Sequence, residues 1–126
     1  MSQYATDLNL FVYMSTMQFH ADHIYTLVDG NLYAVMFAES ATNSQGGYLF
    51  IQRKVGDQVD DMCYIETHDR KYSGRFRMHR LELTARQLLI ELDRPHNNLI
   101  RIHIGLTPSK LTEVSRVISI IRGDQA

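Results

Sequence analysis

The sequence predicts an α+β domain in which a curved, mostly antiparallel sheet of about six to seven strands is covered on one face by a C-terminal helix. Nearly every apolar run alternates with period two, short turn-forming segments separate the runs, and only the last segment has helical spacing. The 126 residues include only two prolines, seven glycines and no linker-like stretch. We therefore expect one domain over residues 1–126.

The strands are predicted from alternation. In residues 99–106, the even-numbered positions are all apolar, whereas Arg101 and His103 share the other face. In residues 31–39 both faces are apolar, which predicts a central strand and leaves burial by a helix or by a second copy, in a homodimer, as alternatives. Residues 20–28 fit a strand or a helical turn. The other predicted strands are 8–14, 48–54, 62–68 and 87–92.

One helix is predicted, after Thr107. Thr107 is suited to cap it, Pro108 to occupy its first position and Gly123 to end it. Between them one stripe is apolar: Leu111, Val114, Val117, Ile118 and Ile121. This helix is expected to cover one face of the sheet.

The single cysteine, Cys63, has no partner for an internal disulfide and lies in an alternating apolar run, so we expect it to be buried. The N-terminal segment has no basic opening and no uninterrupted apolar run, and it therefore resembles neither a signal peptide nor a membrane span. These features predict a cytoplasmic protein without a membrane partner.

The formal net charge of −1 conceals a reversal along the chain. Residues 1–69 hold nine acidic and two basic side chains, and residues 70–126 hold eleven basic and five acidic ones. The two sets form opposite poles of the surface or interleave across the sheet, and the sequence leaves both arrangements open.

Two clusters have the residue types of a reactive site. In His20-Ala21-Asp22-His23, two imidazoles and a carboxylate lie close together, but further ligands are missing nearby and a solvated loop is favoured over a metal site. Glu66, His68 and Asp69 precede Tyr72-Ser73-Gly74, where no nucleophile elbow is present and a structural turn is favoured over a hydrolase site. We predict no enzyme activity, no metal and no cofactor.

A basic segment follows this turn and interleaves arginines with aromatic residues. Such a face suits nucleic acid or an acidic protein surface, or it is simply solvated. A pI of about 6.6 makes nucleic acid the less favoured partner. The segment comprises Arg70, Lys71, Tyr72, Arg75, Phe76, Arg77 and Arg80.

The order of short motifs resembles family ten of the bacterial immunity proteins, the cytosolic antidotes of polymorphic toxin systems. The motifs are YLFIQR from residue 48, CYIE from residue 63, the YSG turn at residues 72–74 and RLEL from residue 80. The resemblance covers roughly residues 30–122. The turn lacks the second glycine common in that family, the first thirty residues have no counterpart, and the basic strand is stronger, so the partner's identity stays open.

The resemblance implies an immunity-protein-like domain that inhibits a cognate toxin protein by binding it. Our candidates for partner contact are Tyr72 as an aromatic anchor, Glu66 as an acceptor, and Arg53, Arg75 and Arg77 as pairing groups. A cross-strand ion pair between Arg53 and Glu66 is an equally weighted structural alternative.

Two other functions remain as alternatives. The first is a nucleic-acid-binding module that uses Arg75, Arg77 and Arg101 on one sheet face. The second is a carrier or enzyme for a small molecule, with an apolar cavity near His20, His23 and His103.

Overall fold

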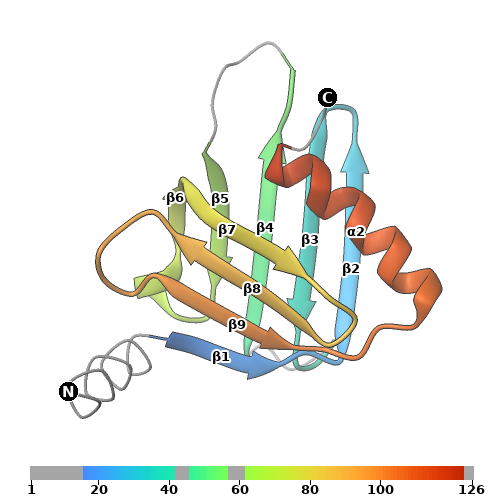
Figure 1. Cartoon of the computed structure of the whole chain (residues 1–126), viewed down its shortest axis with the longest axis horizontal. Helices are drawn as coiled ribbons and strands as arrows, with labels where there is room; N and C mark the ends of the chain where they lie inside the picture. The colour runs from blue at the N-terminus through green and yellow to red at the C-terminus, as the bar shows by residue number, and fades with distance from the viewer. Residues whose placement is uncertain (1–15, 42–45, 57–61, 124–126) are drawn as a thin grey trace, which may run out of the picture.

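The computed structural model describes residues 16–41, 46–56 and 62–123. Its strands form two sheets that lie one behind the other, with the C-terminal helix beside the smaller sheet (Figure 1). The predicted α+β class, the mostly antiparallel pairing and the C-terminal helix are confirmed. The described residues hold nine strands in two sheets, where the sequence predicted about six to seven strands in one curved sheet.

The larger sheet has five antiparallel strands in the order β2-β3-β4-β5-β6. The strand β3 is an inner strand between β2 and β4, as its two apolar faces predict. Residues 20–28, which the sequence left between strand and helical turn, contain the edge strand β2. The bounds are β2 His23–Asp29, β3 Leu32–Ala38, β4 Tyr48–Lys54, β5 Cys63–Thr67 and β6 Gly74–Phe76.

The smaller sheet has four strands in the order β1-β9-β8-β7. The pairing of β1 with β9 is parallel, and the other two pairs are antiparallel. The bounds are β1 Thr16–His20, β7 Met78–Leu83, β8 Gln87–Leu92 and β9 Leu99–His103. The predicted strand at residues 8–14 lies outside the described residues.

The chain passes between the sheets without a long linker. The amide of Ala21 donates to His103 O at 2.8 Å in the smaller sheet, and the next amide, of Asp22, donates to Ala38 O at 3.0 Å in the larger one. A second passage occurs at Arg77, between β6 and β7, where Arg77 O accepts a hydrogen bond from the Asp93 amide. At the first passage the core-facing position shifts by one residue, from Ala21 to Ile24, whereas at the second the alternation runs on from Phe76 to Met78. The second change of sheet is therefore not visible in the pattern.

The helix α2, Pro108–Arg122, begins and ends as the sequence predicts. The Thr107 hydroxyl accepts a hydrogen bond from the Lys110 amide at 3.3 Å, and Pro108 occupies the first turn. Gly123 has φ of 89°, the left-handed conformation that ends many helices and favours glycine.

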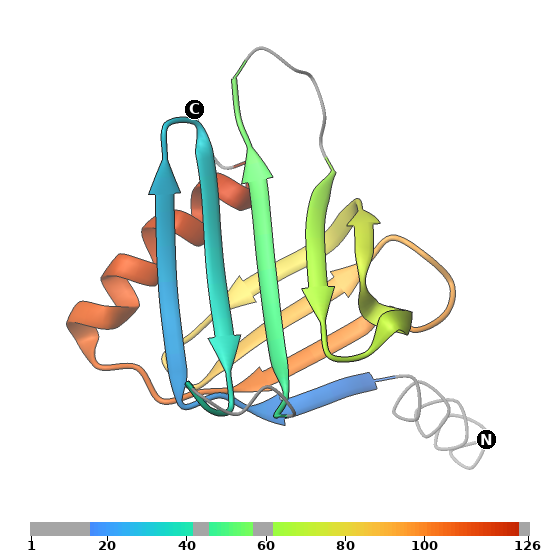
Figure 2. The same ribbon diagram turned by 180° about the vertical axis from the view of Figure 1, so that it is seen from behind.

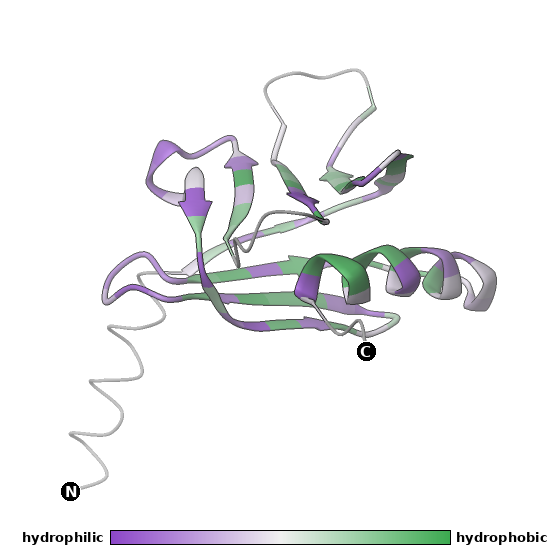
Figure 3. Ribbon diagram, turned by 90° about the horizontal axis from the view of Figure 1, so that it is seen from above, coloured by the Kyte–Doolittle hydropathy of each residue, from purple (hydrophilic) through white to green (hydrophobic). Residues whose placement is uncertain are grey.

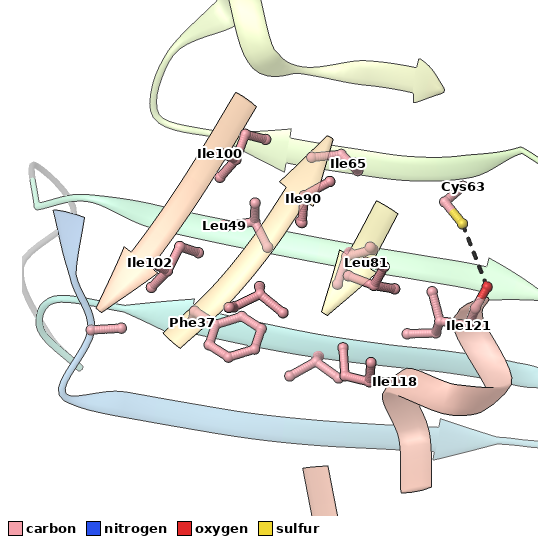
Figure 4. Close-up of a cluster of buried hydrophobic side chains, with 14 of the residues drawn as sticks. Phe37, Leu49, Cys63, Ile65, Leu81, Ile90, Ile100, Ile102, Ile118 and Ile121 are labelled. Atoms are coloured by element: carbon pink, nitrogen blue, oxygen red, sulfur yellow. Dashed lines mark hydrogen bonds between the residues drawn. The ribbon is translucent and has the colours of Figure 1, made fainter. Parts of the chain in front are cut away.

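The core lies between the larger sheet and a layer made of the smaller sheet and α2, which are seen side by side in Figure 3. Side chains from β3, β4 and β5 point toward those from β8, β9 and α2 (Figure 4). Cys63 is buried, as predicted, and its thiol donates a long hydrogen bond to Ile121 O at 3.8 Å. The fully buried large residues include Phe37, Leu49, Ile51, Ile65, Leu81, Leu88, Ile90, Ile100, Ile102, Ile118 and Ile121.

The opposite face of the larger sheet is different. Seen from behind, β2, β3 and β4 lie in front, and no described element covers them (Figure 2). The sheet therefore has one face in the core and one face that, within the described part of the chain, is open to solvent.

Candidate interaction surface on the five-stranded sheet

The open face of the larger sheet, here called the outer face, is rich in apolar and aromatic side chains. Strand registry places Tyr25, Met36 and Phe50 in one row across β2, β3 and β4, and the row ends at Glu66 on β5. Tyr25 and Leu27 remain 51% and 50% exposed. Exposed aromatic and long aliphatic residues on one uncovered face are typical of an interaction surface.

The outer face contains a groove of about 720 Å³. Its floor is β3, where Ala34 and Ala38 are small, and its sides are formed by larger residues of β2 and β4. This volume falls within the range of about 300–1,000 Å³ that is usual for binding pockets. The lining residues are Tyr25, Thr26, Leu27, Ala34, Met36, Ala38, Ser40, Ala41, Gly46, Gly47, Tyr48, Phe50 and Glu66.

Gly47 lines the groove at a position where a side chain does not fit. Its amide donates to Glu39 Oε1 at 2.9 Å, and its carbonyl accepts from the Glu39 amide. A Cβ atom on Gly47 would lie 2.7 Å from Glu39 Oε1 and 2.8 Å from Phe19 Cγ. The close approach of these three residues therefore requires glycine.

Glu66 is the acidic group of the groove and is held by two tyrosines. The Tyr48 hydroxyl donates to Glu66 Oε2 and the Tyr64 hydroxyl donates to Oε1, each at 3.0 Å. The pKa of Tyr48 is raised by burial and then by its bond to Glu66, and the pKa of Tyr64 is raised mainly by its bond to Glu66. Both phenols thus stay protonated at neutral pH and fix the carboxylate in one orientation.

Three of the five predicted contact residues are exposed. Glu66 and Arg75 belong to the larger sheet, and because Arg75 is paired in register with Tyr64 it lies on the same outer face. Arg77 lies at the passage between the sheets. For these three residues, contact with a partner remains a prediction.

The other two predicted contact residues, Arg53 and Tyr72, are engaged within the fold. Arg53 lies on the inner face of β4 and donates to Ile121 O, near the end of α2, at 2.9 Å. It therefore does not form the ion pair with Glu66 that was the structural alternative, since Glu66 lies on the opposite face. Tyr72 is only 4% exposed, with the Arg94 guanidinium 5.9 Å from its ring centroid, which leaves little of it for a partner.

The Tyr72-Ser73-Gly74 segment is a turn held by its own polar groups. A short 3-10 helix, η1 Arg70–Tyr72, is capped by Asp69, whose carboxylate accepts from the Lys71 amide at 3.0 Å. The Ser73 hydroxyl accepts from the Thr67 amide at 2.9 Å and contacts Asp69 O at 3.3 Å. His68, the candidate base, instead accepts from the Tyr48 amide through Nδ1 at 3.0 Å. Ser73 and His68 are therefore engaged in separate structural bonds, and the acid, base and nucleophile of a hydrolase are not brought together.

The histidines named as metal candidates are also separated by the fold. His20 Nε2 lies 3.0 Å from Asp22 Oδ1, but His20 belongs to the smaller sheet and His23 to the larger one. Among the described residues, no three His, Cys, Asp or Glu side chains are grouped to hold a metal ion. The groove, moreover, is not lined by His20, His23 or His103.

The basic residues are spread over both sheets. Arg75 lies on β6 of the larger sheet, and Arg101 lies on β9 of the smaller one. Arg80 lies 3.4 Å from Glu91 and 3.8 Å from Glu82, and Phe76 is covered by the Arg94 guanidinium at 4.5 Å. At these positions opposite charges interleave. The acidic residues Asp57, Asp60 and Asp61 lie outside the described residues.

Sequence reasoning missed most of the outer face, namely Tyr25, Leu27, Met36, Tyr48, Phe50 and Tyr64. The available signal was the apolar composition of both faces of β3, which indicates a second covering layer.

No helix within the described ranges is long and apolar enough to span a membrane. Neither the scan against protein-family models nor the search of curated proteins finds a match for this chain.

Proposed function

We propose that the protein is a cytoplasmic immunity protein that neutralises a cognate bacterial toxin domain by binding it through the outer face of the five-stranded sheet. The observation that supports this proposal best is the grooved, apolar outer face, on which Tyr25 and Leu27 stay half exposed. Desolvation of aromatic and aliphatic anchors supplies most of the binding free energy at protein interfaces.

The scaffold suits inhibition by docking. The outer face is carried by β2, β3 and β4, whose inner faces are packed into the core, so the surface is held in one shape before it meets a partner. Inhibition then requires only that the toxin's active surface be covered, without catalysis by this protein.

The nucleic-acid alternative has less support. A phosphate-binding face needs its cations gathered on one surface. Arg75 and Arg101 belong to different sheets, and Arg80 lies beside two carboxylates. A protein partner therefore fits the arrangement of charges better than a nucleic acid does.

The test is co-expression with the toxin domain encoded beside this gene. We expect the wild-type protein to restore growth and to co-purify with the toxin. The variant Leu27→Asp introduces a charge into the apolar face and should abolish protection. The matched control is Gln18→Asp, at an exposed position of β1 in the smaller sheet, which should protect as well as the wild type.

Persistent toxicity in the presence of folded wild-type protein would contradict the proposal. Equal protection by Leu27→Asp and by the control would show that the toxin binds elsewhere. The mass of the isolated protein in solution tests the homodimer alternative. A stable dimer that becomes monomeric in Leu27→Asp would assign the outer face to self-association instead.

A further inference from the structure

Glu66 is an exposed carboxylate in the lining of a mostly apolar groove. Among the described residues no lysine or arginine forms an ion pair with it, and its bonds are those from the Tyr48 and Tyr64 hydroxyls. A carboxylate held in place beside apolar surface marks a position where a partner's positive charge would be selected.

The geometry of the bonds specifies which cation fits. A carboxylate has about four acceptor sites on its two oxygens, and here each oxygen accepts one phenol. Each oxygen therefore retains a further acceptor site. An arginine guanidinium presents two parallel N–H groups that match the two oxygens, whereas a lysine ammonium presents a single point of charge.

The surroundings of Glu66 favour the same group. The ring of Phe50, paired in register with Glu66, lies next to it on the outer face, with Tyr48 and Tyr64 on either side. Planar guanidinium groups stack on aromatic rings and are less strongly hydrated than ammonium groups. The apolar groove continues from this point across β4 and β3 to β2.

We propose that the groove binds an arginine-bearing apolar segment of the partner protein, with the guanidinium forming a two-pronged pair with Glu66. This inference rests on the proposed function, because it names the chemistry of the toxin surface that the outer face recognises. The apolar side chains beside the arginine fill the groove along β3, and Tyr48 and Tyr64 are positioning residues for the carboxylate.

The test does not require the toxin. Short random peptides displayed on phage are selected against the purified full-length protein, and the enriched peptides are synthesised. We expect them to share an arginine next to apolar residues. Replacing that arginine by citrulline, which keeps the shape but removes the charge, should weaken binding by about tenfold or more, and replacing it by lysine should weaken binding as well.

Variants of the protein complete a double-mutant cycle with these peptides. Glu66→Gln should weaken binding of the arginine peptide by about tenfold. It should leave binding of the citrulline peptide nearly unchanged, because that peptide already lacks the charged pair with Glu66. The matched control is Glu82→Gln, an exposed carboxylate on the smaller sheet, which should bind like the wild type. The citrulline peptide tests the pairing even if Glu66→Gln folds poorly.

Three results would overturn the inference: selection of no peptide, selection of peptides without arginine, or equal binding by wild-type protein and Glu66→Gln. These outcomes are separable from failure of the proposed function. A toxin that is neutralised and bound equally well by Glu66→Gln contradicts only the arginine assignment. Arginine peptides that bind through Glu66, in a protein that neutralises no toxin, contradict only the immunity function.

Discussion

The outer faces of the two sheets differ although both sheets share one core. On the smaller sheet the face away from the core is mostly polar: His103 Nε2 lies 3.2 Å from Gln18 Oε1, and Arg80 lies 3.4 Å from Glu91. On the larger sheet the corresponding face presents Tyr25, Leu27 and the groove. The smaller sheet is thus suited to water on its outer side, whereas the larger one is suited to a second protein surface.

The largest expected effect is the difference in stability loss between a substitution in the core and one on the outer face. Ile90→Ala removes a fully buried side chain between the sheets and should lower the free energy of unfolding by about 2–5 kcal/mol. Met36→Ala, on the outer face, should lower it by less than about 1 kcal/mol, because Met36 is only partly buried. Urea denaturation measures both values, and equal losses would show that the outer face is also part of the core.

The next effect concerns Gly47, in the lining of the groove. Gly47→Ala places a Cβ atom within 3.0 Å of Glu39 and Phe19 and should cost about 1–3 kcal/mol of stability through overpacking. The control is Gly105→Ala. Gly105 follows β9, and a Cβ atom there would have no other atom within 4 Å. If thermal unfolding shows the same loss for both variants, the close approach at Gly47 has no special role.

Arg53 distinguishes a structural role from a role in binding. Arg53→Met removes the hydrogen bond to Ile121 O and should cost about 1.5–3 kcal/mol, because a charged donor near the end of a helix is lost. Binding of the toxin by the folded variant should be unchanged, since Arg53 faces the core side. Calorimetric titration with the toxin checks this, and loss of affinity without loss of stability would return Arg53 to the interface.

The smallest effect is on tyrosine ionisation. The pKa values of Tyr48 and Tyr64 are raised above 10.0, so these phenols hold their protons more tightly in the folded than in the unfolded protein. The stabilisation they provide is therefore complete below the pKa of the unfolded protein and is lost as the pH rises through the folded pKa. Glu66→Gln should bring the Tyr64 pKa closer to its usual value.

The comparison residue is Tyr72, whose pKa is raised first by burial and then by Asp69. Its titration should not change in Glu66→Gln. Ring-carbon NMR resolves the individual tyrosines. A Tyr64 titration that is identical in wild-type protein and variant would show that Glu66 does not hold this hydroxyl.

The elements were predictable where local chemistry decides them. The cap, the first proline and the terminal glycine locate α2 at Pro108–Arg122, and alternation locates β3, β4, β5 and β8 nearly to the residue. The division into two sheets was not predictable, since alternation does not identify which strands pair. At the passage into the second sheet, Arg77 O accepts a hydrogen bond from the Asp93 amide, a contact between residues 16 positions apart that alternation does not reveal.

The candidate site was predicted only in part. Charge and turn motifs predicted Glu66, Arg53 and Tyr72 as contact residues. In the structure Tyr72 is buried in the core, and the alternation of β4 places Arg53 on the inner face. The only sequence signal for the apolar outer face was that both faces of β3 carry apolar residues. Which residues share that face follows from strand registry, and registry is a tertiary property.

The neighbouring amides of Ala21 and Asp22 serve different sheets, and this has a consequence for cooperativity. Ala21 and Asp22 are the only residues between β1 and β2, so the start of the edge strand that carries Tyr25 and Leu27 is tied to the smaller sheet through adjacent backbone hydrogen bonds. Native-state hydrogen exchange should therefore give these two amides a common opening free energy, near that of global unfolding. The rigidity of β2 would then depend on the smaller sheet as well as on its own pairing with β3.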